Sequence, residues 1–520
     1  MNIECFMLKR KLFFLLLSII GISFQSCDKV KDRDGDNSEP FLLSFYLTPD
    51  LNPGIKDTIN SIIKNDTIYL LCRDLYTCQN LIPVFSGNYV SCQVGGAEQY
   101  SGQSSQDFFK NIVDYELTGA NGDKRTYHVI VRLLNGLPVV RIETEGNEAI
   151  VSKNEYIKAE IKIDNTPEYG VIECPGKIKG RGNYTWRVYP KKPYKIKLSE
   201  KQSPLGFPEN KDWVLLAEYC DKSLLRTAYM CEVSKAIGMK YVPRYQHVDL
   251  FLNNNYQGTY ILIDQVEKAK SRVDIQKDGY LIEIDDYYYD EPLSFPTSIE
   301  IPFSFQNDTK RRYYTFKYPD ADDKEIVDGD DKFSYIQSFI YNMETSLTKL
   351  LEDPLNTDYT NYIDIESFAK WYLAVELTGN YDPNMFFVMQ TKGSKLEMAP
   401  LWDAEWSLGL WSLVWGEAPN PLVDDKIAKT IAYFPYLLRS PLFNQELCRV
   451  WKEHKSELFN VRNLISQLCS IISLAQECNN LRWSVLDINP NVKFARVDEE
   501  ITYMVKYFND RYNTLDNTFN

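Results

Sequence analysis

Short apolar segments separated by turn residues run through the first quarter of the chain. The clearest lie at 66–72, 89–94, 113–118 and 125–133, and they are rich in β-branched and aromatic residues. Many short strands with regular turns between them are typical of a β-sandwich. We therefore expect a β-sandwich over 40–137 that acts as a spacer and carries no chemistry.

The alternating pattern continues from 138 to 286, where a single helical segment interrupts it. Strand patterns occur before residue 198 and again at 246–267 and 279–286, and the helical segment covers 222–239. In that segment Gly238 suits the C-terminal cap of a helix. The expected order is strands, one helix, a hairpin and a further strand.

From about residue 330 the apolar positions recur with the period of a helix. Five segments show it, at 333–353, 364–379, 442–459, 461–478 and 499–515. The fold class is therefore α+β: a β-sandwich, then a strand-rich part over 138–286, then a mostly helical part over 287–520.

Composition narrows the possible chemistry. The formal net charge is −14, and His128, His247 and His454 are the three histidines of the sequence. A nucleic-acid partner would require a basic face, so we expect none. No Cys/His cluster has the spacing of zinc ligands, and no Ser-His-Asp pattern is present. Acids, lysines and asparagines are left to carry any reaction.

The N-terminus has the pattern of an export signal. Basic residues precede the apolar run "LFFLLLSIIGISF", and "QSC" follows and ends at Cys27. This resembles the lipobox of bacterial lipoproteins, which implies cleavage of 1–27, lipidation of Cys27 and an anchor in the outer membrane facing the periplasm or the outside. A plain secretory signal with an incidental cysteine is the alternative. Residues 28–39 are polar and acidic, as in a flexible tether.

Seven blocks in a fixed order carry a more specific resemblance. They are "GKIKGRGNYTW", "KKPYKIKL", "WVLLAEYCDKSLLR", "VDLFLNNNYQGTYILIDQVE", "GYLIEIDD", "ELTGNYDPNMFFVMQ" and "APLWDAEWSLG". Together they resemble the CotH family of secreted, atypical protein-kinase-like enzymes, over about residues 150–450. The front segment resembles the immunoglobulin-like modules of Bacteroidetes lipoproteins. The resemblance implies a two-lobed kinase-like domain with a strand-rich small lobe and a helical large lobe.

Phosphoryl transfer needs cations on the nucleotide phosphates, and the resemblance implies where they are. Lys195 and Lys197 share one face of the strand "YKIKL", and one of them is expected to reach the phosphates of ATP. A helical glutamate should pair with that lysine, and Glu232 is the choice. Arg181, in a glycine-containing turn, and Arg226 are further expected nucleotide contacts.

The same resemblance implies a catalytic acid and a magnesium site. Asp382 is the expected acid that orients the acceptor hydroxyl, which belongs to a protein or another cell-surface molecule. Asn384, or Asn380 in its place, and Asp403 are expected to hold Mg²⁺ or Mn²⁺. Glu405 stands where the family usually has a second aspartate, and on an extended strand it would share a face with Asp403.

Two other functions start from the same residues. Trp402, Trp406, Trp411 and Trp415 could stack on sugar rings beside the two acids, as in a carbohydrate-binding or carbohydrate-active protein. Glycosidase carboxylates, however, flank the bond from opposite sides. The third possibility is a non-catalytic surface lipoprotein.

The lipobox prediction is testable by substitution. Cys27→Ser removes the thiol that would carry the lipid, so the processed protein should leave the membrane fraction and should no longer incorporate labelled fatty acid. Continued incorporation would contradict the assignment.

Overall fold

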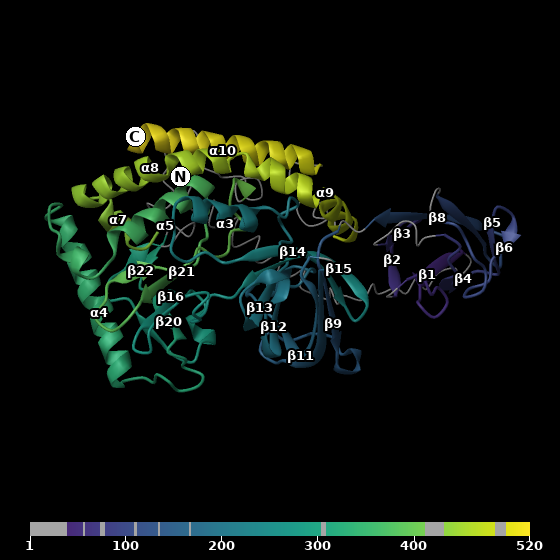
Figure 1. The fold of residues 1–520 in the computed structure, drawn as a ribbon, viewed down its shortest axis with the longest axis horizontal. Helices are drawn as coiled ribbons and strands as arrows, with labels where there is room; N and C mark the ends of the chain where they lie inside the picture. Colours follow the sequence, from purple (N-terminus) through teal and green to yellow (C-terminus); the bar gives the residue numbers. More distant parts are fainter. Residues whose placement is uncertain are drawn as a thin grey trace. The chain divides into compact units, whose positions relative to one another are not determined.

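The computed structural model describes residues 39–55, 58–72, 79–108, 112–133, 136–165, 168–302, 308–410, 431–483 and 496–520. Cys27, the signal segment, nearly all of the tether, Trp411 and Trp415 lie outside these ranges. The chain forms two compact units (Figure 1). The first comprises the chain up to Leu133 together with Tyr184–Lys192, and the second comprises Leu134–Asn183 and Pro193–Asn520.

The first unit is built on one continuous ladder of eight strands. Their order is β4, β1, β2, β3, β8, β7, β5, β6, and β3 pairs with β8 in parallel. The bounds are Phe41–Leu47 (β1), Ile59–Lys64 (β2), Thr67–Cys72 (β3), Pro83–Asn88 (β4), Ser91–Val94 (β5), Ala97–Glu98 (β6), Val113–Thr118 (β7) and Lys124–Leu133 (β8). The unit also includes the short helix α2, Tyr184–Val188.

Aromatic side chains hold the two ends of this ladder face to face. Phe45 on β1 packs edge-on against Tyr115 on β7, with ring centroids 5.2 Å apart, although these strands are not neighbours in the ladder. Phe85 on β4 lies 5.7 Å from the same tyrosine ring. Two faces closing over a shared apolar core fit the predicted β-sandwich.

The second unit begins with a closed seven-stranded barrel. The order around it is β10, β11, β12, β13, β15, β14, β9, and parallel pairing of β14 with β9 closes it. The bounds are Val139–Thr144 (β9), Ile157–Asn165 (β10), Gly170–Gly180 (β11), Tyr194–Gln202 (β12), Asn210–Leu216 (β13), Tyr245–Leu252 (β14) and Asn255–Asp264 (β15).

A second sheet combines the predicted strand at 279–286 with strands from the part for which the sequence pattern predicted mostly helix. Its order is β17, β20, β16, β21, β22, and it combines strands that are about 100 residues apart in the chain. The bounds are Tyr280–Ile284 (β16), Ser294–Pro296 (β17), Tyr313–Tyr318 (β20), Met385–Met389 (β21) and Leu396–Met398 (β22), and the pair β18 (Ile301–Pro302) and β19 (Thr309–Lys310) lies beside them in sequence. The sequence pattern predicted the strand at 279–286 but not its pairing partners, because that pairing joins segments far apart in the chain.

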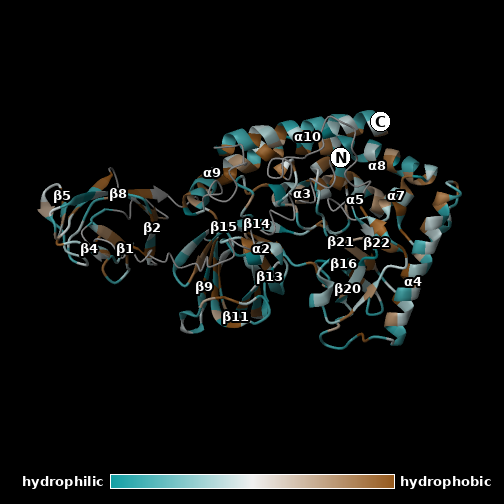
Figure 2. Ribbon diagram, turned by 180° about the vertical axis from the view of Figure 1, so that it is seen from behind, coloured by the Kyte–Doolittle hydropathy of each residue, from teal (hydrophilic) through white to brown (hydrophobic). Residues whose placement is uncertain are grey.

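Helices complete the second unit, and all five segments with a helical period are helical. The bounds are Arg226–Ala236 (α3), Asp331–Thr348 (α4), Ile365–Thr378 (α5), Phe434–Leu437 (α7), Pro441–Val461 (α8), Leu464–Arg482 (α9) and Val497–Phe519 (α10), and the 3₁₀ turns are Glu145–Asn147, Pro204–Gly206, Tyr288–Asp290, Lys349–Leu351 and Asp358–Asn361. Asp364 caps α5 by accepting a bond from the Ser367 amide at 2.8 Å. Hydrophilic residues line the outer face of α10 in Figure 2.

The stretch Pro441–Arg482 is long and apolar enough to pass a test for membrane-spanning helices. It consists of α8 and α9, and Phe443, Leu447 and Trp451 of α8 are buried in the core. The apolar window that passes the test is itself 28% buried.

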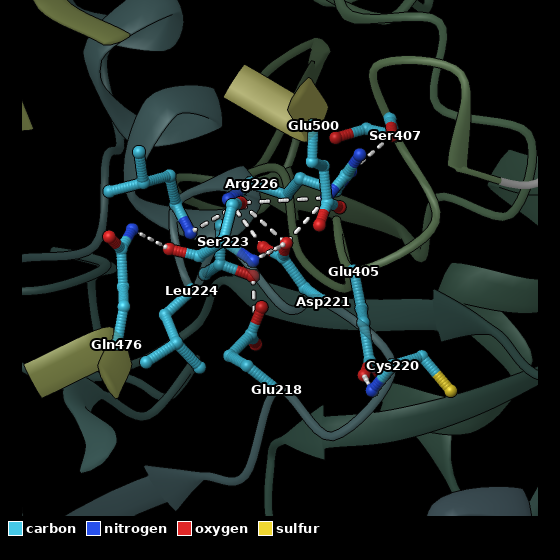
Figure 3. A network of polar contacts seen from close by, with 12 residues as sticks. Glu218, Cys220, Asp221, Ser223, Leu224, Arg226, Glu405, Ser407, Gln476 and Glu500 are labelled. Atoms are coloured by element: carbon cyan, nitrogen blue, oxygen red, sulfur yellow. Dashed lines mark hydrogen bonds and ion pairs between the residues drawn. The ribbon is translucent and has the colours of Figure 1, made fainter. Parts of the chain in front are cut away.

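A buried arginine ties three distant parts of the second unit together (Figure 3). Arg226, the first residue of α3, is 0% exposed and pairs with Asp221 and with Glu500 of α10. Its Nε donates to the backbone oxygen of Ser407 at 2.9 Å. The start of α3, the segment after β22 and the C-terminal helix are therefore joined through one guanidinium group.

Glu218 lies in the same interior. It accepts a bond from the Thr227 hydroxyl at 3.0 Å, and its second carboxyl oxygen has no hydrogen-bond partner among the described residues. Burial, together with the nearby Glu405 and Asp221 carboxylates, raises the pKa of Glu218 well above its ordinary value of 4.5.

The arginine should be essential to stability. Arg226→Met leaves two buried carboxylates without their counter-ion, so the free energy of unfolding should fall by about 3–5 kcal/mol. Urea unfolding measures this. Arg449→Met, which removes an arginine from an exposed ion-pair cluster, should cost about 0–1 kcal/mol, and equal losses in the two variants would contradict the special role of Arg226.

Glu218 predicts a pH-dependent stability. Because its pKa is raised in the folded state, the folded chain keeps a proton that the unfolded chain releases, and stability falls as pH rises above 4.5. Glu218→Gln removes this dependence and should raise the free energy of unfolding by about 1 kcal/mol at pH 8. Near pH 4 the two proteins should unfold alike, and a difference that does not change with pH would contradict the assignment.

Candidate active site

The loop after α5 lies against the segment after β22. Asn380, which is 1% exposed, donates from Nδ2 to the backbone oxygen of Asp403 at 3.0 Å. Its Oδ1 accepts from the backbone amide of Asp382 at 3.2 Å. The backbone amide of Asn384 donates to the backbone oxygen of Trp402 at 3.4 Å. The structure thus brings Asp382, Asn384 and Asp403 into one region, and Asn380 serves as the brace between their loops.

Asp403 has an unusual backbone and a charged neighbour. Its φ is +60°, in the left-handed region that few residues other than glycine adopt. Loss of solvation near the surrounding protein raises the pKa of the Asp403 carboxyl, and the Arg181 guanidinium opposes that rise. The side chain is exposed, so solvent tempers both effects. Arg181 itself lies over the Trp402 ring, 5.5 Å from its centre.

Glu283 is a buried acid beside this region that the sequence analysis did not single out. It lies on β16, accepts from Nδ2 of Asn384 at 2.6 Å and pairs with Lys317 at 3.1 Å. Burial raises the pKa of Glu283 to about 7, although Lys317 and Asn384 oppose it. The sequence signal was a single acid within the otherwise apolar strand "YLIEI", whose five residues are all buried.

Lys317 links Glu283 to further acids. Its ammonium group lies 3.1 Å from both Glu283 and Glu291. Burial raises the pKa of Asp285, and Lys317 opposes that rise. Lys317 on β20 therefore lies between acids on β16 and on the segment after β16.

The strand lysines form a separate basic face on the barrel. Lys195 and Lys197 on β12 stand directly opposite Lys179 and Lys177 on β11. Among the described residues, the ion pairs of Lys195 and Lys197 are to Asp212, at 3.5 and 3.9 Å. Burial and the nearby Lys195 lower the pKa of Lys179. Like charges at opposed strand positions repel each other, so this face favours an anion.

Two of the expected nucleotide contacts have other partners. Glu232 bonds to Lys235 one turn away at 2.7 Å and to the hydroxyl of Tyr245 at 2.9 Å, and not to a strand lysine. Arg226 is fully enclosed by its own ion pairs. The helix that carries both residues begins only at Arg226, because Leu224 has a φ of +58°.

Glu405 does not share a face with Asp403, contrary to the expectation for an extended strand. The left-handed backbone at Asp403 turns the chain, and Glu405 is 6% exposed. Its carboxylate accepts from the backbone amide of Cys220 at 2.5 Å (Figure 3). The arrangement therefore argues against Glu405 as a second ligand of a metal held by Asp403.

Within the described ranges, no group of three or more His, Cys, Asp or Glu side chains could hold a metal. The Asp403 carboxylate and the Asn384 amide oxygen are nevertheless hard oxygen donors, which suit Mg²⁺ when phosphates and water complete its shell. The donor chemistry of the site fits this ion.

Comparisons with known proteins add the family. A crystal structure described as that of a candidate glycoside hydrolase from Bacteroides thetaiotaomicron matches with 11% identity over 58% of this chain and 88% of its own, but with a TM-score of 0.17 it carries no argument. No curated protein matches the chain. The family described as CotH kinase protein matches residues 178–515, so the chain belongs to the CotH kinase family.

Proposed function

We propose that the protein is a CotH-type enzyme that uses ATP and Mg²⁺ to phosphorylate a hydroxyl group on a protein or another cell-surface molecule. Family membership supports the reaction class. The observation that carries the proposal is the hydrogen-bonded set in which Asn380 joins the backbones of Asp382 and Asp403. Such a set holds a catalytic acid and a metal-binding acid in fixed register.

The residues of this set divide the work of phosphoryl transfer. Asp382 accepts a hydrogen bond from the acceptor hydroxyl and orients it toward the terminal phosphate. Asp403 and Asn384 would hold Mg²⁺, which neutralises charge on the phosphates when bound. The left-handed backbone at Asp403 is compatible with this role, because residues other than glycine in that region occur often at functional sites.

The basic face on the barrel is the proposed phosphate contact. Lys195 and Lys197 remain candidates, and Lys179 joins them because it stands opposite Lys195 and lies two residues before Arg181 on the chain. Arg181 lies near Asp403 and balances its charge. We leave out Glu232 and Arg226, since both are engaged in contacts within the protein.

The larger organisation is part of the same proposal. The barrel with its lysines would be the small lobe and the second sheet with its helices the large lobe of a kinase-like domain, divided near residue 286. The β-sandwich would be a spacer, and lipidated Cys27 would anchor the protein in the outer membrane. The motif order and the N-terminal sequence pattern support these assignments.

The carbohydrate alternative has less support. Trp402 and Trp406 are both buried, with at most 9% of their surface exposed. A ring that stacks on a sugar must present an open face, so neither tryptophan offers a platform.

Two substitutions separate the proposed roles. Asp403→Asn removes the charge that would hold Mg²⁺, so both turnover and the Mg²⁺-dependent affinity for ATP should fall. Asp382→Asn should lower turnover by about 10²- to 10⁴-fold and leave nucleotide affinity nearly unchanged, because its work concerns the acceptor. Calorimetry with a non-hydrolysable ATP analogue and a turnover assay measure the two effects.

A matched control removes a carboxylate elsewhere. Asp358→Asn breaks an exposed pair with Lys349 and should change neither quantity. We would abandon the kinase assignment if folded wild-type protein showed no Mg²⁺-dependent ATP binding at millimolar nucleotide.

A further inference from the structure

One contact in the site has no role in the scheme above. The side-chain amide of Asn384 donates from Nδ2 to Oε1 of Glu283 at 2.6 Å, across 101 residues of sequence. Glu283 is 5% exposed, and its other oxygen pairs with Lys317. Both oxygens of a buried carboxylate are therefore engaged, and one of them holds the amide of a proposed metal ligand.

The chemistry of an amide gives this contact a consequence. An asparagine side chain has a donor end and an acceptor end, and only the acceptor end can bind a cation. A carboxylate accepts hydrogen bonds and cannot donate them. Because Glu283 engages the NH₂ group, the amide cannot turn by 180° without losing this bond, and its oxygen stays at the opposite end.

We propose that Glu283 is a positioning residue that fixes the orientation of the Asn384 amide so that its oxygen is presented to the metal. This inference rests on the proposed function and adds a residue from β16 to it. Pairing with Lys317, which also contacts Glu291, holds the Glu283 carboxylate in place. Groups that orient the ligands of a metal commonly account for 10- to 100-fold of its affinity.

The test compares metal binding among variants that keep the size of the side chains. In Glu283→Gln the new amide can offer either end to Asn384, so the orientation is no longer fixed. Mn²⁺ binding with a non-hydrolysable ATP analogue, followed by electron paramagnetic resonance, should weaken roughly 10-fold or more. Glu291→Gln is the matched control, because it removes a partner of Lys317 without touching Asn384, and it should bind Mn²⁺ like the wild type.

An exchange of donor and acceptor tests the orientation itself. Asn384→Asp alone sets two carboxylates against each other and should also weaken Mn²⁺ binding. In E283Q/N384D the amide at position 283 can donate to the carboxylate at position 384, which keeps an oxygen for the metal. The double variant should therefore bind Mn²⁺ more tightly than either single variant, a rescue that a merely structural role of Glu283 would not produce.

The outcomes separate the two proposals. Wild-type protein that binds no Mn²⁺ with nucleotide overturns the proposed function and this inference with it. Wild-type protein that binds, together with an E283Q variant that binds equally well or an E283Q/N384D variant without rescue, overturns this inference alone. Thermal unfolding of each variant without ligand shows which losses come from misfolding, and the rescue comparison is made among folded variants.

Discussion

The fold of the second unit depends on compensating the buried positive charge of Arg226. A guanidinium that is fully buried is costly unless carboxylates compensate it. Asp221, five residues before Arg226, and Glu500, 274 residues after it, supply that compensation. The same group holds the backbone at Ser407, four residues beyond Asp403. The segment that carries the proposed metal ligand is therefore fixed from one side by Arg226 and from the other by Asn380. Charge compensation in the interior thus helps to hold the segment that carries the proposed metal ligand.

The sequence predicted secondary structure well where apolar residues recur at a regular interval. Five helices could be predicted because their apolar faces recur with the helical period. The strand at 279–286 was also predicted, but its pairing with strands about 100 residues away was not, because that pairing is a tertiary contact. The start of α3 was placed too early because the turn at Leu224 arises from local hydrogen bonds that hydrophobicity does not report.

The candidate site shows a similar division. Motif order led to Asp382, Asn384 and Asp403, which the structure brings into one region. That Asp403 and Glu405 point in different directions could not be predicted, because the turn at Asp403 depends on a contact with Asn380, 23 residues earlier. Glu283 gave little signal, since its partner Asn384 is more distant still in sequence. Contacts of this kind follow from the tertiary fold and leave no local pattern.

The long sequence separation of these contacts has a consequence for how the chain is made. The barrel closes only when β14 pairs with β9, about 100 residues after β9 has been synthesised. Glu500 stands 274 residues beyond Arg226, so the interior charge is not fully compensated until the chain is almost complete. Contacts between such distant segments form late and slowly. The second unit is therefore expected to fold after synthesis and as a whole, and a chain that ends before α10 should become a substrate for proteases rather than a partly folded protein.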